Sequence, residues 1–239
     1  MISSHTDRVS SRPPHSHSSF FYGLLWAAAS DVMTPHLPVV SALALFPRGC
    51  GNSSMSSDMY IAGYHSITNI DYSSVCISTM SARHSDCPGM TWHEMDVQQL
   101  SFPDATFDVV LEKATLDAIM VEEKTPWEVS PQTACFIHKA LTEISRCLKP
   151  GGRFVSITFA NPFFRKRLYA RAEYNWSIKK YTYGEGFQYY VYVMTKGEEL
   201  SPEDAALEKK LLEDTKSPPT VVTTTQNEPE EEFLSNIDL

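Results

Sequence analysis

Short apolar runs rich in β-branched and aromatic residues alternate with stretches of helical periodicity through the middle of the chain. Alternation of this kind is typical of βαβ units, in which helices connect parallel strands. Five runs predict strands, at 39–45, 66–70, 91–95, 106–111 and 153–159. The pattern therefore predicts an α/β fold built on a mostly parallel sheet.

Helical stretches lie between these predicted strands. They cover about 54–62, 74–83 and 130–148, and a basic stretch after residue 159 predicts one more. Ser73 or Ser74 can cap the second helix. Ser130 followed by Pro131 is an N-cap with a first-turn proline, which fixes the start of the third.

Two aromatic runs, 176–183 and 187–195, close the patterned region and flank a short segment with two glycines. A connection of this length and composition predicts an antiparallel hairpin. Together with the five earlier strands, it predicts a Rossmann-like sheet of seven strands with an antiparallel hairpin at its C-terminal end.

The two ends of the chain have a different composition. The first 19 residues are rich in Ser, His and Pro, and the last part combines a threonine run with a glutamate run. Such compositions cannot bury enough apolar surface to order themselves. We expect residues 1–36 to form a divergent, disordered segment, 37–213 the folded domain, and 214–239 an acidic low-complexity tail.

Charge and cysteine content restrict the partners and the compartment. The chain of 239 residues has 29 acidic and 20 basic residues, and the whole acidic excess lies after residue 197. The near-neutral body argues against direct nucleic-acid binding. The five cysteines form no C-x-x-C pair, and the apolar run at 20–29 is too short to span a membrane. We expect a reduced, cytoplasmic protein without membrane contact.

A glycine turn follows the first predicted strand. Gly49 and Gly51 stand where glycine lets the backbone approach a ligand and where a helix N-terminus offers free N–H groups. Asp71 comes 20 residues later, at the end of the next strand, where a carboxylate can accept hydrogen bonds from ribose hydroxyls. The combination predicts a nucleoside-containing cofactor. The alternative is an ordinary turn followed by an exposed aspartate.

Three features favour S-adenosylmethionine among such cofactors. The dinucleotide fingerprint has a third glycine where this chain has Ser54, which argues against NAD. Asp96, at the end of the third strand, is placed to bind an adenine amino group. The terminal hairpin also fits a methyltransferase sheet better than an all-parallel dinucleotide fold.

Several segments together resemble the class I methyltransferases, most closely the eukaryotic lysine methyltransferases of elongation factor 1-alpha. They are 49–53 (GCGNS), 71–74 (DYSS), 95–97 (MDV), 107–117 (FDVVLEKATLD) and 148–154 (LKPGGRF). The resemblance covers about residues 49–200 and includes the last seven residues. It is more specific than the glycine turn alone.

The resemblance implies cofactor contacts at four places. These are the glycine turn, the ends of the second and third strands, which hold the ribose and the adenine, and the end of the fourth strand, which closes the site. The residues concerned are Gly49, Asp71, Tyr72, Asp96, Val97 and Lys113. The chain has Ala114 where the family has glycine, a change that is tolerated if φ is negative there.

The expected function is transfer of a methyl group to a lysine of elongation factor 1-alpha by a monomeric enzyme. The neutral amine displaces the methyl group in line, so orientation and deprotonation of the lysine are needed rather than a catalytic triad. Residues 1–48 do not match the family, whose Trp and Tyr residues there help to enclose the cofactor. The alternatives are therefore a methyltransferase-like protein with weak or no activity, because this lid is missing, and an enzyme with another small-molecule or nucleotide cofactor.

The substrate side of the site is less defined by the sequence, and no catalytic residue is assigned. Asp117 can orient a substrate amine, or it can be a capping or surface residue. The basic residues 165–167, 171, 179 and 180 can meet an acidic partner or form a solvated face. Aromatic residues can line a lysine channel or pack in the core; these are Trp127, Phe163, Phe164 and Trp176. His93 and His138 are isolated, so no metal site is expected.

Overall fold

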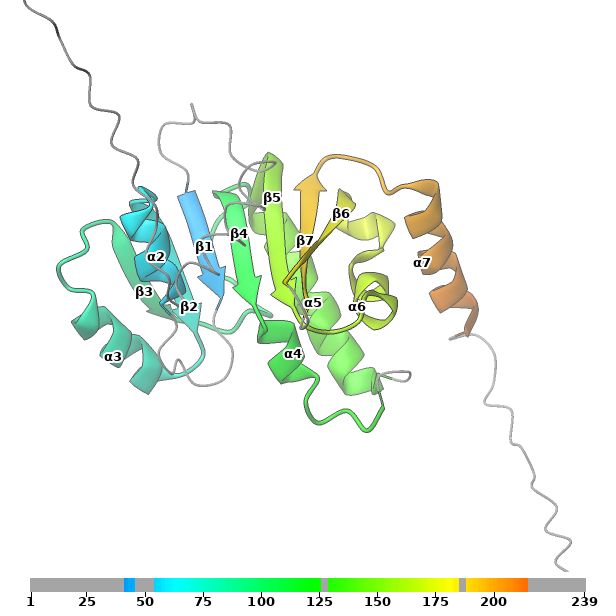
Figure 1. Ribbon diagram of the computed structural model, residues 1–239, viewed down its shortest axis with the longest axis horizontal. Coiled ribbons are helices and arrows are strands. Elements are labelled where there is room, and N and C mark those ends of the chain that lie inside the picture. The colour runs from blue at the N-terminus through cyan, green and yellow to red at the C-terminus, as the bar shows by residue number, and fades with distance from the viewer. Residues whose placement is uncertain (1–40, 46–53, 126–128, 185–187, 215–239) are drawn as a thin grey trace, which may run out of the picture.

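The computed structural model describes residues 41–45, 54–125, 129–184 and 188–214. Its strands are β1 (Ser41–Leu45), β2 (Ser66–Asp71), β3 (Met90–Glu94), β4 (Phe107–Lys113), β5 (Leu148–Thr158), β6 (Trp176–Tyr183) and β7 (Tyr189–Lys196). The helices are α2 (Met55–Ile61), α3 (Ser74–Arg83), α4 (Thr115–Ile119), α5 (Pro131–Cys147), α6 (Pro162–Tyr169), the 3-10 turn η1 (Ala172–Tyr174) and α7 (Pro202–Asp214). Figure 1 shows the strands side by side in one sheet, flanked by the helices.

The strands form a seven-stranded sheet in the order β3-β2-β1-β4-β5-β7-β6. β1 pairs in parallel with both β2 and β4, and β7 is antiparallel to both β5 and β6. The predicted Rossmann-like sheet with a C-terminal antiparallel hairpin is confirmed. Because β1 to β5 are parallel, their carboxyl ends meet at one edge of the sheet, where ligands bind in folds of this kind.

Two α-helices were not predicted from the sequence, and one strand begins well before its predicted start. α4 and α7 are the additional helices. β5 begins at Leu148 because this residue already pairs with Phe107, before a register shift that precedes Val109. The predicted segment 1–36 lies outside the described residues, and so does the predicted tail 214–239 apart from Asp214, the last residue of α7, so the domain limits stay predictions.

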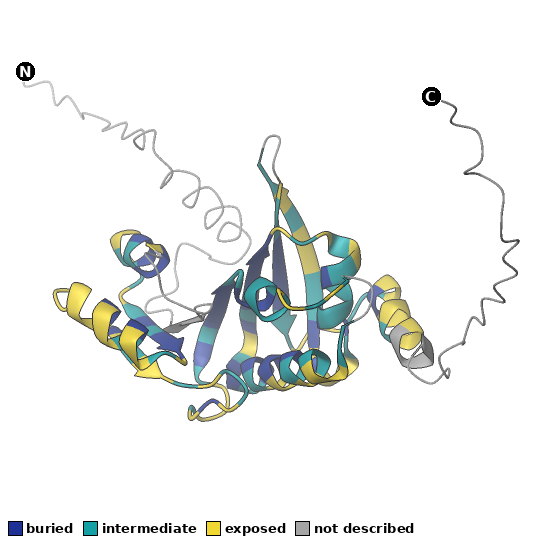
Figure 2. Ribbon diagram, turned by 90° about the horizontal axis from the view of Figure 1, so that it is seen from below, coloured by how far each residue is buried: buried dark blue, intermediate teal, exposed yellow. Residues whose placement is uncertain are grey.

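The apolar core consists of two clusters, one on each face of the sheet. Side chains of α5 belong to the first cluster and side chains of α2 to the second. Neighbouring residues of one strand belong to different clusters, as Val110 and Leu111 of β4 do, because successive side chains of a strand point to opposite faces. In Figure 2 the buried residues concentrate on the strands, and exposed residues cover the outer sides of helices such as α3 and α7.

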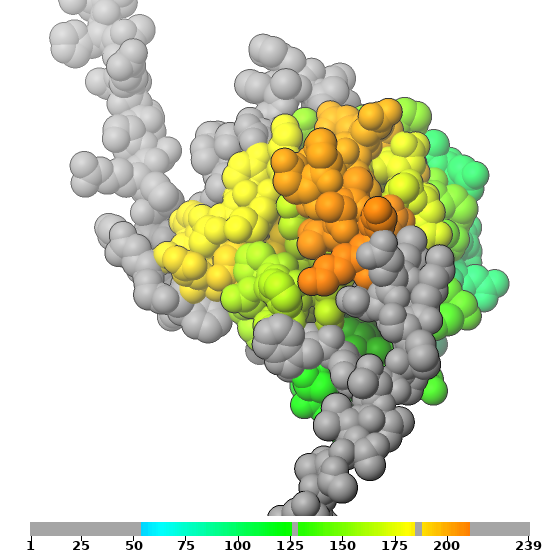
Figure 3. All heavy atoms as spheres, turned by 90° about the vertical axis from the view of Figure 1, so that its right-hand side faces the viewer, coloured from blue at the N-terminus to red at the C-terminus, as the bar shows by residue number. Residues whose placement is uncertain are grey.

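The last described helix, α7, packs beside α6 at the end of the molecule that carries the hairpin (Figure 3). Lys166 of α6 pairs with Asp204 of α7 at 2.5 Å, and Asp204 is almost completely buried. Ser201 accepts a hydrogen bond from the Asp204 N–H through its hydroxyl, 3.2 Å away, at the start of the helix. The helix is thus fixed to the domain by an ion pair.

A buried carboxylate connects the end of β4 to the start of α4. Glu112 accepts a hydrogen bond from the Thr115 N–H at 2.8 Å through one oxygen, and from the Ser156 hydroxyl through the other. The Ser156 hydroxyl also lies 2.6 Å from the phenol oxygen of Tyr169 on α6. Burial raises the pKa of Glu112 to about 7, opposed by the Ser156 hydrogen bond and the charge of Arg165. These contacts fix how α4 leaves the sheet.

Ala114, between β4 and α4, has a left-handed backbone, with φ of 58° and ψ of 15°. A negative φ would have made the alanine an unstrained substitute for the family's glycine. The positive φ means that the Cβ atom is strained against its own backbone. The Ala114 N–H donates to the carbonyl of Ile157 at 2.9 Å, so the sheet holds this conformation in place.

We expect Ala114→Gly to stabilise the protein by about 1 kcal/mol, because glycine relieves the left-handed strain by more than it adds in chain entropy. Urea unfolding measures the difference. Ala206→Gly is the control: it changes an exposed alanine inside α7 and should cost about 0.5–1 kcal/mol. Equal destabilisation by both variants would contradict the strain assigned to Ala114.

The raised pKa of Glu112 predicts a pH-dependent stability. The folded state holds this proton more tightly than the unfolded state, so the contribution of the group is present at acidic pH and is lost as the pH rises from about 4.5 towards 7. Glu112→Gln removes the titration. The free energy of unfolding of E112Q relative to the wild type should therefore rise by on the order of 3 kcal/mol between pH 5 and pH 8. Urea titrations at several pH values measure it, and a constant difference would contradict the assignment.

Candidate functional site

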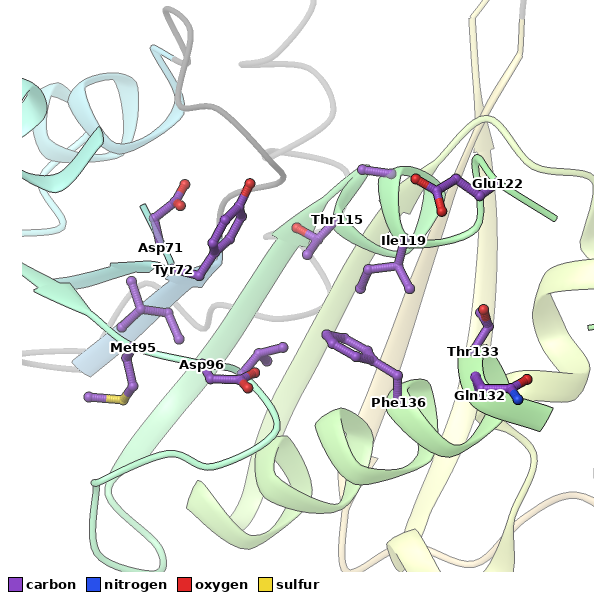
Figure 4. A pocket seen from close by; sticks show the side chains of 13 residues that line it. Asp71, Tyr72, Met95, Asp96, Thr115, Ile119, Glu122, Gln132, Thr133 and Phe136 are labelled. Carbon is purple, nitrogen blue, oxygen red and sulfur yellow. The ribbon is translucent and has the colours of Figure 1, made fainter. Parts of the chain in front are cut away.

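A cavity of about 470 Å³ opens at the carboxyl edge of the sheet. Its walls come from the end of β2, the segment after β3, α4 with the turn that follows it, and the first turns of α5. Figure 4 shows the side chains around this space. They are Ile70, Asp71, Tyr72, Met95, Asp96, Val97, Thr115, Ala118, Ile119, Glu122, Gln132, Thr133 and Phe136.

Asp71 presents a buried acceptor to this cavity. The residue is only 2% exposed, which rules out the exposed aspartate considered as the alternative. One carboxylate oxygen accepts a hydrogen bond from the Ser73 N–H at 2.8 Å, whereas the other has no partner within the described parts of the chain. Burial raises the pKa of Asp71, and the N–H groups of Ser73 and Tyr72 oppose this. A buried oxygen without a partner is costly, so the site is suited to a ligand that donates a hydrogen bond.

Tyr72, Asp96 and Val97 line the same cavity. Asp96 is oriented by Gln98, whose backbone N–H donates to one carboxylate oxygen at 2.9 Å. The carboxylate can also accept from an amino group, and the aromatic ring of Tyr72 and the apolar side chain of Val97 can flank a flat heterocycle. The structure thus brings together four of the residues predicted from the sequence.

The other three predicted cofactor residues are not among the described residues that line the cavity. Gly49 and Gly51 lie outside the described residues. Lys113 does not line the cavity, because it follows Glu112 on β4 and so faces the opposite side of the sheet. There it lies near Asp58 of α2, whose charge opposes the lowering of its pKa by burial.

The sequence did not predict the wall formed by α4 and α5. Thr115, Ala118 and Ile119 of α4 and Phe136 of α5 line the cavity across from the end of β2. α4 has no side-chain N-cap, so no capping signal marked its start. The Ser130–Pro131 signal located α5, but it does not show which face of the helix meets a ligand.

A second cavity, of about 400 Å³, lies on the other side of α4. Thr115, Ala118 and Ile119 face the first cavity, whereas Asp117 faces the second, so this helix forms part of the wall of both. The remaining lining residues come from the segment after α4 and from the end of β5 with α6. They are Met120, Val121, Glu123, Thr125, Phe159, Ala160, Asn161, Phe164 and Arg165.

Asp117 and Arg165 form a buried ion pair in this second cavity. Their side chains are 7% and 2% exposed. The Asp117 oxygen that meets Arg165 also accepts from the Thr158 hydroxyl at 2.7 Å, and its second oxygen is buried without a partner among the described residues. A surface role for Asp117 and a solvated face for Arg165 were both wrong, because each charge is neutralised by the other inside the protein.

The structure also locates most of the other residues that the sequence suggested for the substrate side of the site. Trp176 belongs to the core, Phe164 lines the second cavity, and Trp127 lies outside the described residues. Arg171 pairs with Glu173 at 3.1 Å. Within the described ranges there is no group of three residues that could hold a metal ion, and no helix is both long and apolar enough to cross a membrane.

The cysteines differ in state. Cys87, Cys135 and Cys147 are free, whereas Cys76 in α3 is disulfide-bonded. The expectation of a fully reduced set of cysteines is therefore wrong for Cys76.

Comparisons with known proteins agree with this arrangement. A family model described as a methyltransferase domain matches residues 48–156. EEF1A lysine methyltransferase 4 of Bos taurus is 43% identical over 209 residues, covering 87% of this chain and 81% of that protein. The Mus musculus protein of the same name is 44% identical over 191 residues, covering 80% and 74%. The bovine alignment is longer than the segment from residue 49 to the end, so it includes part of residues 1–48.

Among solved structures, the N-methyltransferase NodS of Bradyrhizobium japonicum, in complex with S-adenosyl-L-homocysteine, has the same fold. The TM-score is 0.53 at 15% identity, and the match covers 74% of this chain and 86% of that one. The unpaired oxygen of Asp71 and the apolar walls of the first cavity suit the nucleoside of S-adenosylmethionine. The chain therefore belongs to the EEF1A lysine methyltransferase 4 family of S-adenosylmethionine-dependent methyltransferases.

Proposed function

We propose that this protein transfers a methyl group from S-adenosylmethionine to a lysine of elongation factor 1-alpha. The names of its relatives support the substrate. The observation that carries the proposal is the pair of cavities on either side of α4, one with the Asp71 acceptor and the other with the Asp117 acceptor. Such an arrangement suits a cofactor and a substrate amine that approach each other from two sides.

The first cavity holds the cofactor in this proposal. The unpaired oxygen of Asp71 accepts a hydrogen bond from a ribose hydroxyl, and Asp96 accepts from the adenine amino group. Tyr72 and Val97 flank the adenine ring. Gly49 and Gly51 approach the rest of the cofactor, and Lys113 closes the site from outside the first cavity, on the α2 face, as the family resemblance implies.

The second cavity receives the lysine. S-adenosylmethionine supplies an electrophilic methyl group on a sulfonium, so the amine must arrive without its proton and in line. The unpaired oxygen of Asp117 can accept a hydrogen bond from the amine and orient its lone pair. Arg165 neutralises Asp117, so the pair does not present a net negative charge that would hold the lysine as an ammonium ion. Burial lowers the pKa of such a lysine further.

The same proposal implies a cellular compartment and an oligomeric state for the protein. A translation factor as substrate places the enzyme in the cytoplasm. The near-neutral body of the chain gives no reason for direct contact with nucleic acid. The proposal keeps the expectation that the enzyme acts as a monomer.

Replacing Asp71 tests the cofactor site. We expect Asp71→Ala to weaken binding of S-adenosylmethionine by about 2–4 kcal/mol, because it removes a charge-assisted hydrogen bond to the ribose. Isothermal titration calorimetry measures the affinity. Asp86→Ala, which removes an exposed carboxylate after α3, should leave it unchanged. Equal affinity of the wild type and D71A would exclude Asp71 from the site.

Replacing Asp117 tests the amine site. Asp117→Asn keeps an oxygen for Arg165 and Thr158 but puts an amide N–H₂ group where the unpaired oxygen lies. We expect kcat for methylation of elongation factor 1-alpha to fall by about a hundredfold, because the amine loses its orientation, while cofactor affinity stays the same. A radiolabelled methyl-transfer assay measures the rate, and thermal unfolding checks that the variant is folded. If D117N transfers methyl groups at the wild-type rate, the role of Asp117 is wrong.

A further inference from the structure

Three exposed apolar side chains surround the second cavity. Val121 and Phe159 line it, and they are 73% and 55% exposed. Phe163, at 63% exposure, is the third; its ring lies edge-on to Phe164, which lines the cavity, with 5.3 Å between the ring centroids. We call Val121, Phe159 and Phe163 the apolar rim.

The apolar rim stands out from the rest of the described surface. Seven large hydrophobic residues are strongly exposed in the described parts of the chain, and three of them are these rim residues. They come from the segment after α4 and from both sides of the start of α6, so the fold gathers them from distant parts of the sequence. Exposed apolar side chains that are grouped around a cavity often mark a binding site, whereas single exposed apolar side chains are common on any protein surface.

The backbone beneath two of the rim residues is held by hydrogen bonds. Asn161 caps α6, and its side-chain oxygen accepts from the Phe163 N–H at 2.9 Å. The Ala160 N–H donates to the Thr158 hydroxyl oxygen at 2.9 Å, and that hydroxyl in turn donates to Asp117. The rim is thus connected to the buried acceptor by a short chain of contacts, so a ligand does not have to order this surface on binding.

We propose that the apolar rim is a docking subsite for an apolar residue that neighbours the target lysine in the protein substrate, while the lysine side chain itself enters the second cavity towards Asp117. This inference rests on the proposed function and adds a sequence preference to it. The chemistry of the site selects this occupant. The inner oxygen of Asp117 requires an N–H donor, the rim requires apolar contact, and a lysine beside an apolar residue supplies both. The shared wall formed by α4 puts that lysine next to the cofactor cavity.

Substitutions on the rim test the proposal with purified elongation factor 1-alpha as the substrate. Val121→Ser, Phe163→Ser and the double variant remove apolar contact without creating a buried cavity. We expect the KM for the factor to rise by roughly tenfold in the double variant. The kcat value, the affinity for S-adenosylmethionine and the midpoint of thermal unfolding should remain at wild-type values. The single variant Phe163→Leu keeps an apolar side chain and should therefore have a KM close to that of the wild type.

Ile61→Ser is the matched control. Ile61 is 74% exposed, as much as Val121, but it is the last residue of α2. That helix follows the carboxyl end of β1 and returns to the opposite edge of the sheet, so I61S should leave every parameter unchanged.

Each other outcome overturns a defined part of the proposal. If the wild type does not methylate the factor at all, the proposed function fails and the docking subsite fails with it. If the wild type is active and the double variant keeps its KM, the function stands and the subsite is wrong. A fall in KM, or a change of oligomeric state in size-exclusion chromatography, would mean that a segment of this chain or a second copy covers the rim, which also overturns the proposal.

Discussion

The position of α4 depends on the hydrogen bonds of Glu112. This buried carboxylate accepts from the Thr115 N–H and from the Ser156 hydroxyl, so it joins the end of β4, the start of α4 and the last residues of β5. The geometry is demanding, because Ala114 must adopt a left-handed backbone between the strand and the helix. A short helix without a side-chain cap has little stability of its own. It is the sheet, through Glu112, that determines where α4 lies.

The shape of both cavities depends on this one constraint, because α4 forms part of the wall of each. Successive residues of α4 point to different sides, so Thr115 and Ala118 face the first cavity and Asp117 faces the second cavity. A rotation of the helix would move both sets of side chains together. The alignment of a methyl donor with an amine is sensitive to displacements of about 1 Å, so in the proposed reaction the shared wall formed by α4 sets the position of one reactant relative to the other.

Local sequence signals predicted the parts of the fold that depend on local physics. Alternating apolar runs predicted the strands, and Ser130–Pro131 predicted the start of α5. Asp71 could be placed at the site because parallel strands bring their carboxyl ends to one edge. α7 has the same kind of signal in Ser201 and Pro202, so its start can be predicted in the same way. α4 and the pairing of Asp117 with Arg165 could not be predicted, because they depend on contacts between residues far apart in the chain.

Two neighbouring basic residues of α6 each pair with a buried carboxylate. Arg165 pairs with Asp117 on the side of the second cavity, and its neighbour Lys166 pairs with Asp204 of α7. Replacing such pairs by apolar residues is often neutral or stabilising, so stability alone does not account for them. A charged pair has directional hydrogen bonds, which an apolar contact lacks. The Asp117 pair leaves one carboxylate oxygen unpaired within the described chain, and in the proposed reaction this is the oxygen that orients the incoming amine.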